Sequence, residues 1–118
     1  MSGALAAPLP SHARSPLGVT LFGAGWCHFC HSAAQLLVSL QNAGQVELLV
    51  ISIDHRPIGV VTDPVPDDGH AAALGVHGVP VTVVFDPATG EPSHFIRGFR
   101  GYGPFLKELR AAAAAISS

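Results

Sequence analysis

Two cysteines, three positions apart, are the residues of this chain best suited to covalent chemistry. Cys27 and Cys30 are the only cysteines among the 118 residues, so the sequence lacks the disulfide framework that small secreted folds use. Residues three apart share one face of a helix, where their Cα atoms lie about 5–6 Å from each other, a separation that a disulfide tolerates. The pair can therefore alternate between a disulfide and two thiols with little backbone movement.

The two sulfurs are expected to have different roles. If a helix begins directly after Cys27, its unpaired N–H groups and its positive dipole end favour an anion at this residue. We therefore expect Cys27, exposed at the turn, to have a lowered thiol pKa and to be the nucleophile, with added stabilisation from His28 when that side chain is protonated. Cys30, one turn deeper, is the expected resolving thiol, which attacks the mixed disulfide and releases the reduced substrate.

Two other chemistries could use the same segment. A Cys-x-x-Cys pair can hold zinc, but structural zinc takes four ligands, and His28 and His31 are too close in sequence to complete a tetrahedron easily with both cysteines. The five residues from Cys27 to His31 also form Cys-x-x-Cys-His, the attachment signature of c-type haem, with His31 as the axial ligand. Met1 is the only methionine, so the chain offers no internal methionine as a sixth ligand. The alternative to thiol exchange is thus a c-type haem- or metal-binding module.

The elements that position the cysteine pair follow from the hydrophobic pattern. Residues 18–22 are apolar and rich in strand formers, and a Gly-Ala-Gly break follows them. From His28 to about Asn42 apolar residues recur at spacings of three and four, which predicts a helix with the cysteines at its start. The nearly all-apolar run 46–53 is typical of a strand covered on both faces in a parallel sheet.

The second half of the sequence predicts a loop, a short helix, a hairpin and a last helix. Residues 54–69 contain three prolines and several aspartates and are expected to form an irregular loop. A short helix capped by Asp67 or Asp68 should follow. Residues 81–85 and 93–97 are expected to pair as an antiparallel hairpin, and the C-terminal segment has an amphipathic helical pattern. One mixed sheet flanked by helices, an α/β fold, accounts for this order.

Composition and charge restrict the class of protein and its partners. Hydrophobic residues make up 48% of the chain and charged residues 12%, which favours a folded domain over a disordered one. The net charge is −2 and no basic stripe is present, so we expect no nucleic-acid partner. No apolar run approaches the roughly 18 residues of a membrane span. Residues 1–17 are expected to be a flexible arm and residues 18–118 one domain, acting as a monomer.

The compartment depends on the origin of this arm. Residues 1–17 lack the basic start and the longer apolar stretch of a secretory signal. If they remain from a trimmed signal peptide, the protein is periplasmic or exported; otherwise it is cytoplasmic.

Several segments resemble the thioredoxin family. Residues 25–30, Gly-Trp-Cys-His-Phe-Cys after a buried strand, are similar to its active site. Residues 51–54 resemble the end of its central strand, and residues 74–82 resemble the segment around its cis-proline. The similarity extends over about residues 18–116, with Gly98 before the C-terminal helix as a further match.

The resemblance implies a thioredoxin-like three-layer fold and disulfide exchange with protein thiols or disulfides. It implies no cofactor besides the redox-active disulfide Cys27–Cys30, no metal, and a redox partner that the sequence does not identify. Pro80 would be the cis-proline beside the cysteines, where it offers no N–H to the sulfurs. The backbone of Val79 would pair with an extended substrate segment, and Trp26 would form part of the docking surface.

Three departures from the family pattern bear on the direction of the reaction. His28 and Phe29 stand where the family usually has Gly-Pro, and they are expected to tune the redox pair. Leu21 stands where thioredoxins usually have a buried aspartate that assists proton transfer, and Val50 stands where they have a nearby lysine. The loop of residues 55–68 is longer than in plain thioredoxins. We expect a reductase, but not a housekeeping thioredoxin.

Overall fold

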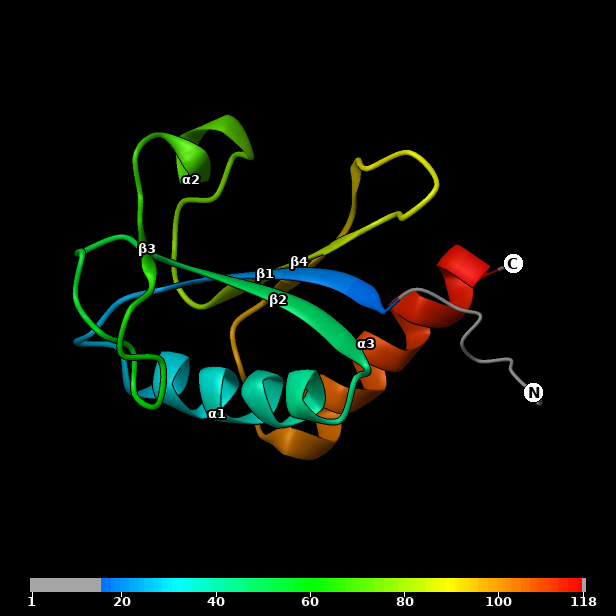
Figure 1. The fold of residues 1–118 in the computed structure, drawn as a ribbon, viewed down its shortest axis with the longest axis horizontal. Coiled ribbons are helices and arrows are strands. Elements are labelled where there is room, and N and C mark those ends of the chain that lie inside the picture. Colours follow the sequence, from blue (N-terminus) through cyan, green and yellow to red (C-terminus); the bar gives the residue numbers. More distant parts are fainter. Residues whose placement is uncertain (1–15, 118) are drawn as a thin grey trace, which may run out of the picture.

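Five strands form one mixed sheet in the computed structural model, which describes residues 16–117 (Figure 1). Their order across the sheet is β3-β2-β1-β4-β5. The first three strands of the chain are parallel, β4 is antiparallel to β1, and β5 is antiparallel to β4. The strands are β1 (Leu17–Gly23), β2 (Val46–Ser52), β3 (Val65–Pro66), β4 (Val81–Phe85) and β5 (Pro92–Arg97).

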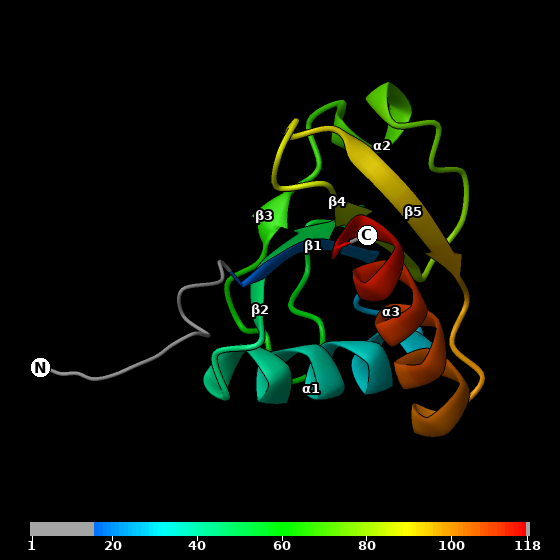
Figure 2. The same cartoon turned by 90° about the vertical axis from the view of Figure 1, so that its right-hand side faces the viewer.

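Three helices complete the described part of the chain and give the fold three layers. These are α1 (His28–Asn42), α2 (His70–Ala73) and α3 (Tyr102–Ser117). The long helices α1 and α3 cover one face of the sheet, and α2 lies on the other (Figures 1 and 2). The predicted α/β three-layer fold is confirmed. None of these helices, all within residues 16–117, is long and apolar enough to cross a membrane.

Strand β1 occupies the middle of the sheet and is covered on both faces. Alternate residues of a strand point to opposite faces, and here Leu21 joins the core beneath α1 and α3 while Phe22 joins the core beneath α2. Both side chains are fully buried. The apolar core on each face therefore fixes the strand that leads into the cysteine motif.

Most of the predicted elements are confirmed to within one or two residues, but three details differ. The middle strand of the sheet is β1, whereas the segment that resembles the family's central strand ends β2. The predicted loop contains a two-residue strand, β3, which the sequence Val65–Pro66 does not predict. The N-cap of α2 is Gly69, at φ 94°, instead of either aspartate. Of the expected arm, residues 1–15 lie outside the described residues.

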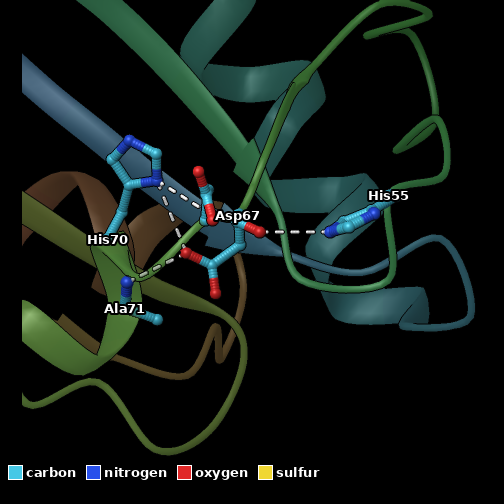
Figure 3. A network of polar contacts seen from close by, with 5 residues as sticks. His55, Asp67, His70 and Ala71 are labelled. Carbon is cyan, nitrogen blue, oxygen red and sulfur yellow. Dashed lines mark hydrogen bonds and ion pairs between the residues drawn. The ribbon is translucent and has the colours of Figure 1, made fainter.

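Hydrogen bonds of Asp67 hold the loop between β2 and α2 in place (Figure 3). The N–H of Asp67 donates to the carbonyl of Ser52 at 3.0 Å, and its own carbonyl accepts from Nε2 of His55 at 3.1 Å. Its carboxylate accepts from the N–H of Ala71 at 3.1 Å and lies 3.5 Å from Nδ1 of His70. One residue thus joins the end of β2, the loop and the first turn of α2.

A buried hydroxyl in β4 provides a test of the packing. Thr82 is fully buried opposite Leu21, and within the described part of the chain its Oγ1 has no hydrogen-bond partner. An unsatisfied buried polar group costs about 1–3 kcal/mol. Because valine has nearly the same shape, Thr82→Val is expected to raise the free energy of unfolding by about 1 kcal/mol or more, measured by urea denaturation.

The matched control is Thr62→Val, at an exposed position, which should change stability by less than about 0.5 kcal/mol. A lower stability of Thr82→Val would mean that the hydroxyl has a partner and that this assignment is wrong.

Candidate active site

The cysteine motif begins in a tight turn between β1 and α1. The N–H of Cys27 donates to the carbonyl of Ala24 at 3.2 Å and closes the turn. Cys27 has an extended backbone, φ −90° and ψ 108°, and is the N-cap residue of α1. Its Sγ accepts a hydrogen bond from the N–H of Cys30 at 3.1 Å. A sulfur thus takes the place that serine or aspartate oxygens usually occupy at a helix N-terminus, where the helix dipole favours negative charge.

The two cysteines form a disulfide across the first turn of α1. Their Cα atoms are 5.2 Å apart, as the helical spacing predicts. Cys27 is 6% exposed and Cys30 is completely buried. The expectation that Cys27 is exposed at the turn is wrong for this disulfide form, because neighbouring residues cover most of it. Of the two sulfur-bearing residues, Cys27 is still the one with some contact to solvent.

Apolar groups surround Cys30 on the core side. A Cβ added to Gly23 would lie 3.0 Å from Cδ1 of Ile58 and 3.3 Å from Sγ of Cys30, so both side chains pack directly against the backbone of Gly23. Ile58, from the loop after β2, is fully buried. The loop that the sequence presented as irregular therefore supplies part of the wall around the resolving cysteine.

Leu21 and Val50 are direct neighbours in the sheet. They are Cα partners in the parallel pairing of β1 with β2, and both are buried in the same core cluster as Cys30. The two positions where the thioredoxin resemblance leads one to expect a carboxylate and a lysine are thus an adjacent apolar pair. Apolar surroundings disfavour a charged thiolate, so Cys30 gains no charge stabilisation from these two side chains.

Gly25, in the middle of the turn, has both of its backbone polar groups bonded to side chains. Its N–H donates to the carboxylate of Asp54, with 3.0 Å to each oxygen. Its carbonyl accepts from Nε2 of His31 at 2.8 Å. Hydrogen bonds to the carboxylate, first from Gly25 N–H and then from the Ser52 hydroxyl and Arg56 N–H, hold the pKa of Asp54 below its ordinary value of 3.8, although desolvation acts in the opposite direction.

The sequence predicts neither the contact of Asp54 nor that of His31 with Gly25. Asp54 belongs to a segment that resembles the family pattern, and the sequence offers His31 as a haem or metal ligand. The contact between Gly25 and Asp54 joins residues 29 positions apart, so no local sequence pattern predicts it. A glycine before the motif and an aspartate at the end of a strand were the available signals.

The Val79–Pro80 peptide bond is cis, as the family resemblance implied. Phe22 of β1 is paired with Val81 of β4, so the preceding residue, Pro80, lies at the same edge of the sheet as the end of β1. The carbonyl of Pro80 accepts from the N–H of Gly98 at 2.8 Å, which fixes this loop to the segment before α3. The cis-proline loop and the cysteine motif therefore share one edge of the sheet.

Two large apolar side chains of the motif face the solvent. Trp26 is 70% exposed and Phe29 is 57% exposed, and the ring of the exposed His28 contacts the Phe29 ring edge-on, with centroids 5.7 Å apart. A surface pocket of about 370 Å³ adjoins Val79 on the α2 side. Its apolar lining includes Ile53, Ala71 and Val76. Of the predicted docking and tuning residues, Trp26, His28 and Phe29 are thus exposed to a partner, whereas Val79 is half-buried and Pro80 is buried.

The same segment does not fit a covalently attached haem in this fold. Thioether attachment needs both sulfurs to be accessible, and Cys30 is completely buried. Axial ligation through Nε2 of His31 would also break its hydrogen bond to the carbonyl of Gly25. For a metal ion, residues 16–117 contain no group of three or more His, Cys, Asp or Glu side chains that could hold one.

The TraF family, described as F plasmid transfer operon protein, matches residues 8–100, which is more than half of the chain. The protein belongs to the TraF family. A comparison with curated protein sequences found no match.

Solved structures similar to this TraF-family protein share the thioredoxin fold. A protein from Chlorobium tepidum, assigned as the thiol:disulfide interchange protein DsbE, has a TM-score of 0.62 and 18% identity, over 92% of this chain and 84% of its own. DsbF of MTB has a TM-score of 0.60 and 20% identity, over 90% and 84%. Thioredoxin O2 from Arabidopsis thaliana, in its oxidized state, has a TM-score of 0.59 and 22% identity, over 82% and 74%. At these identities the likeness establishes the fold. Together with the cysteine pair, it supports thiol–disulfide oxidoreductase activity at a general level.

The close packing around Gly25 can be tested by adding one methyl group. A Cβ at this position would lie 2.8 Å from Cβ of Arg56 and 2.9 Å from the carbonyl oxygen of Pro57, so the loop would have to move. Gly25→Ala is therefore expected to lower the free energy of unfolding by about 1–3 kcal/mol in thermal or urea denaturation.

Gly78→Ala is the matched control, because an added Cβ there meets nothing within 4 Å. It should cost less than about 0.5 kcal/mol. Equal stability of the two variants would argue against close packing at Gly25.

Proposed function

We propose that this TraF-family protein is a thiol–disulfide oxidoreductase that reduces disulfides in protein substrates. The observation that carries the proposal is the state of Cys27: its Sγ forms the disulfide with Cys30 and accepts the N–H of Cys30 at the start of α1. When the disulfide is reduced, the same N–H and the helix dipole are in place to stabilise a thiolate at Cys27.

The first step is attack of the Cys27 thiolate on one sulfur of a substrate disulfide. A bond forms between Sγ of Cys27 and that sulfur, and the substrate S–S bond breaks. The departing substrate sulfur leaves as a thiolate and takes a proton from solvent. Cys27 is the attacking residue because it retains contact with solvent, whereas Cys30 has none.

The second step is resolution of the mixed disulfide by Cys30. Its thiol loses a proton and attacks Sγ of Cys27, so the Cys27–Cys30 disulfide forms and the second substrate sulfur leaves as a thiolate. The substrate gains two electrons and the enzyme loses two. A separate thiol reductant, the unidentified redox partner, must then reduce the enzyme disulfide before another cycle.

The surroundings of the pair favour reduction as the direction. A strongly stabilised thiolate makes the reduced form more stable and the protein a stronger oxidant. Here Cys30 lies in an apolar core with Leu21 and Val50. The ion pairs found within residues 16–117, His70–Asp67 and Arg100–Glu108, involve no residue of the motif. Because Cys30 gains no charge stabilisation from these neighbours, its thiolate adds little to the stability of the reduced form, and the dithiol should give up electrons readily.

Protein substrates fit the surface beside the cysteines. Val79 precedes the cis-proline, and its backbone could pair with an extended segment of the substrate. The apolar pocket beside Val79 and the exposed ring of Trp26 would flank such a segment. The structural neighbour DsbE is assigned to thiol:disulfide interchange, the type of reaction proposed for this chain.

The roles of the two cysteines are tested by single substitutions. Cys27→Ser is expected to abolish reduction of insulin, followed by turbidity in the presence of dithiothreitol, because no nucleophile remains at the turn. Cys30→Ser should instead accumulate mixed disulfides with substrate, detected on non-reducing gels, because the attacking thiol remains and the resolving thiol is gone. Full activity of Cys27→Ser, or no trapped species with Cys30→Ser, would contradict the assignment.

The direction is tested by the reduction potential of the Cys27–Cys30 couple, measured by equilibration with glutathione or dithiothreitol. A reductase should give a value near that of thioredoxin, about −270 mV. A value near that of the strong oxidant DsbA, about −120 mV, would contradict the reductase proposal.

A further inference from the structure

We propose that Asp54 and His31 are positioning residues for thiol exchange, which hold Gly25 from both sides and thereby keep Sγ of Cys27 at the start of α1. This inference rests on the proposed function. In this proposal neither side chain contacts Sγ of Cys27. They act through the backbone of the turn, with Gly25 N–H to the Asp54 carboxylate at 3.0 Å and Gly25 carbonyl to His31 Nε2 at 2.8 Å.

The turn needs such support because its middle residue is a glycine. Glycine has more backbone freedom than any other residue, and the turn carries one backbone hydrogen bond across it, from Cys27 N–H to the Ala24 carbonyl. Larger residues are excluded at Gly25 by Arg56 and Pro57. The limited space thus requires a flexible glycine at position 25, and the side chains of Asp54 and His31 restrict its flexibility.

The two supporting side chains come from different elements, and each is itself held in place. Asp54 lies just after β2 and accepts further hydrogen bonds from Ser52 Oγ at 2.8 Å and Arg56 N–H at 3.2 Å. His31 lies in the first turn of α1, where the backbone of Gly59 packs against it: a Cβ added to Gly59 would be 3.3 Å from Cβ of His31. The turn is therefore fixed to β2, to the loop and to α1 at once.

The hydrogen bond from His31 does not depend on a positive charge. A carbonyl oxygen only accepts, so Nε2 must carry the proton, and it does so both in one neutral tautomer and in the imidazolium. A glutamine side chain can place an N–H donor at a similar distance from the backbone. Comparing glutamine with alanine at position 31 therefore separates the hydrogen bond from the ring and from its charge.

The consequence for chemistry concerns the thiolate of Cys27. Its stabilisation by Cys30 N–H and by the helix dipole acts over a short distance and depends on the N-cap geometry. If the turn loosens, Sγ spends less time at this position and the thiolate is less favoured. The midpoint of Cys27 ionisation in the reduced protein should then rise.

The experiment measures the rate of Cys27 alkylation by iodoacetamide against pH in the reduced full-length chain, with mass spectrometry to confirm the site. We expect the midpoint of His31→Ala to lie at least about half a pH unit above that of His31→Gln, which means about threefold less thiolate below the midpoint. Asp54→Ala should lie above Asp54→Asn by a similar amount, because asparagine keeps an acceptor oxygen and both variants lack the charge.

A half-buried histidine outside the turn gives the matched control. His94→Ala, on β5, should leave the midpoint where the unmodified chain has it. Circular dichroism verifies that each variant is folded. If one variant of a pair does not fold, the comparison relies on the other pair. If the Cys27 midpoint of His31→Ala equals that of His31→Gln, and that of Asp54→Ala equals that of Asp54→Asn, the positioning role is wrong.

This measurement is independent of turnover. If the unmodified protein fails to reduce insulin while the midpoints shift as expected, the proposed function is wrong and the positioning of Cys27 stands. If insulin is reduced and the midpoints of each pair coincide, the function stands and the positioning role is wrong.

Discussion

The hydrogen bond from the N–H of Cys30 to Sγ of Cys27 is the contact on which the candidate site depends. It exists because Cys27 is the N-cap of α1, so that one sulfur meets the unpaired N–H groups of a helix. The cap in turn requires β1 to end at Gly23 and the chain to turn within four residues. Burial of β1 on both faces holds this strand in place, and so the apolar core supports the position of a polar contact.

The surroundings of the two sulfurs differ in kind. Polar groups support the Cys27 side, through the turn at Gly25 and its bonds to Asp54 and His31. Apolar groups surround Cys30, where Ile58 packs against Gly23 and the core contains Leu21. Hydrogen bonds and a helix dipole favour a thiolate, whereas an apolar environment disfavours one. The difference in role between the cysteines therefore follows from their surroundings as well as from their order in the sequence.

Periodic segments of the sequence predicted the fold because each strand and long helix buries a face whose period is visible locally. The cysteine spacing predicted the geometry of the pair in the same way. What escaped prediction depends on contacts between distant segments or on very short elements. β3 has two residues, Gly69 is the N-cap residue of α2 although Asp67 bonds to its first turn, and Asp54 reaches Gly25 across 29 positions. A single sequence shows the residue types at such positions but not their partners.

The long loop after β2 illustrates how an irregular segment can serve a site. Its only regular element is the two-residue strand β3, yet this part of the described chain supplies Asp54 to the turn and Ile58 to the wall beside Cys30. Asp67 anchors its far end to Ser52 and α2. Because the loop contacts both the turn before Cys27 and the core beside Cys30, a change in its packing would affect the surroundings of both cysteines. Gly23 has no side chain, and Ile58 of this loop packs against its backbone beside Cys30.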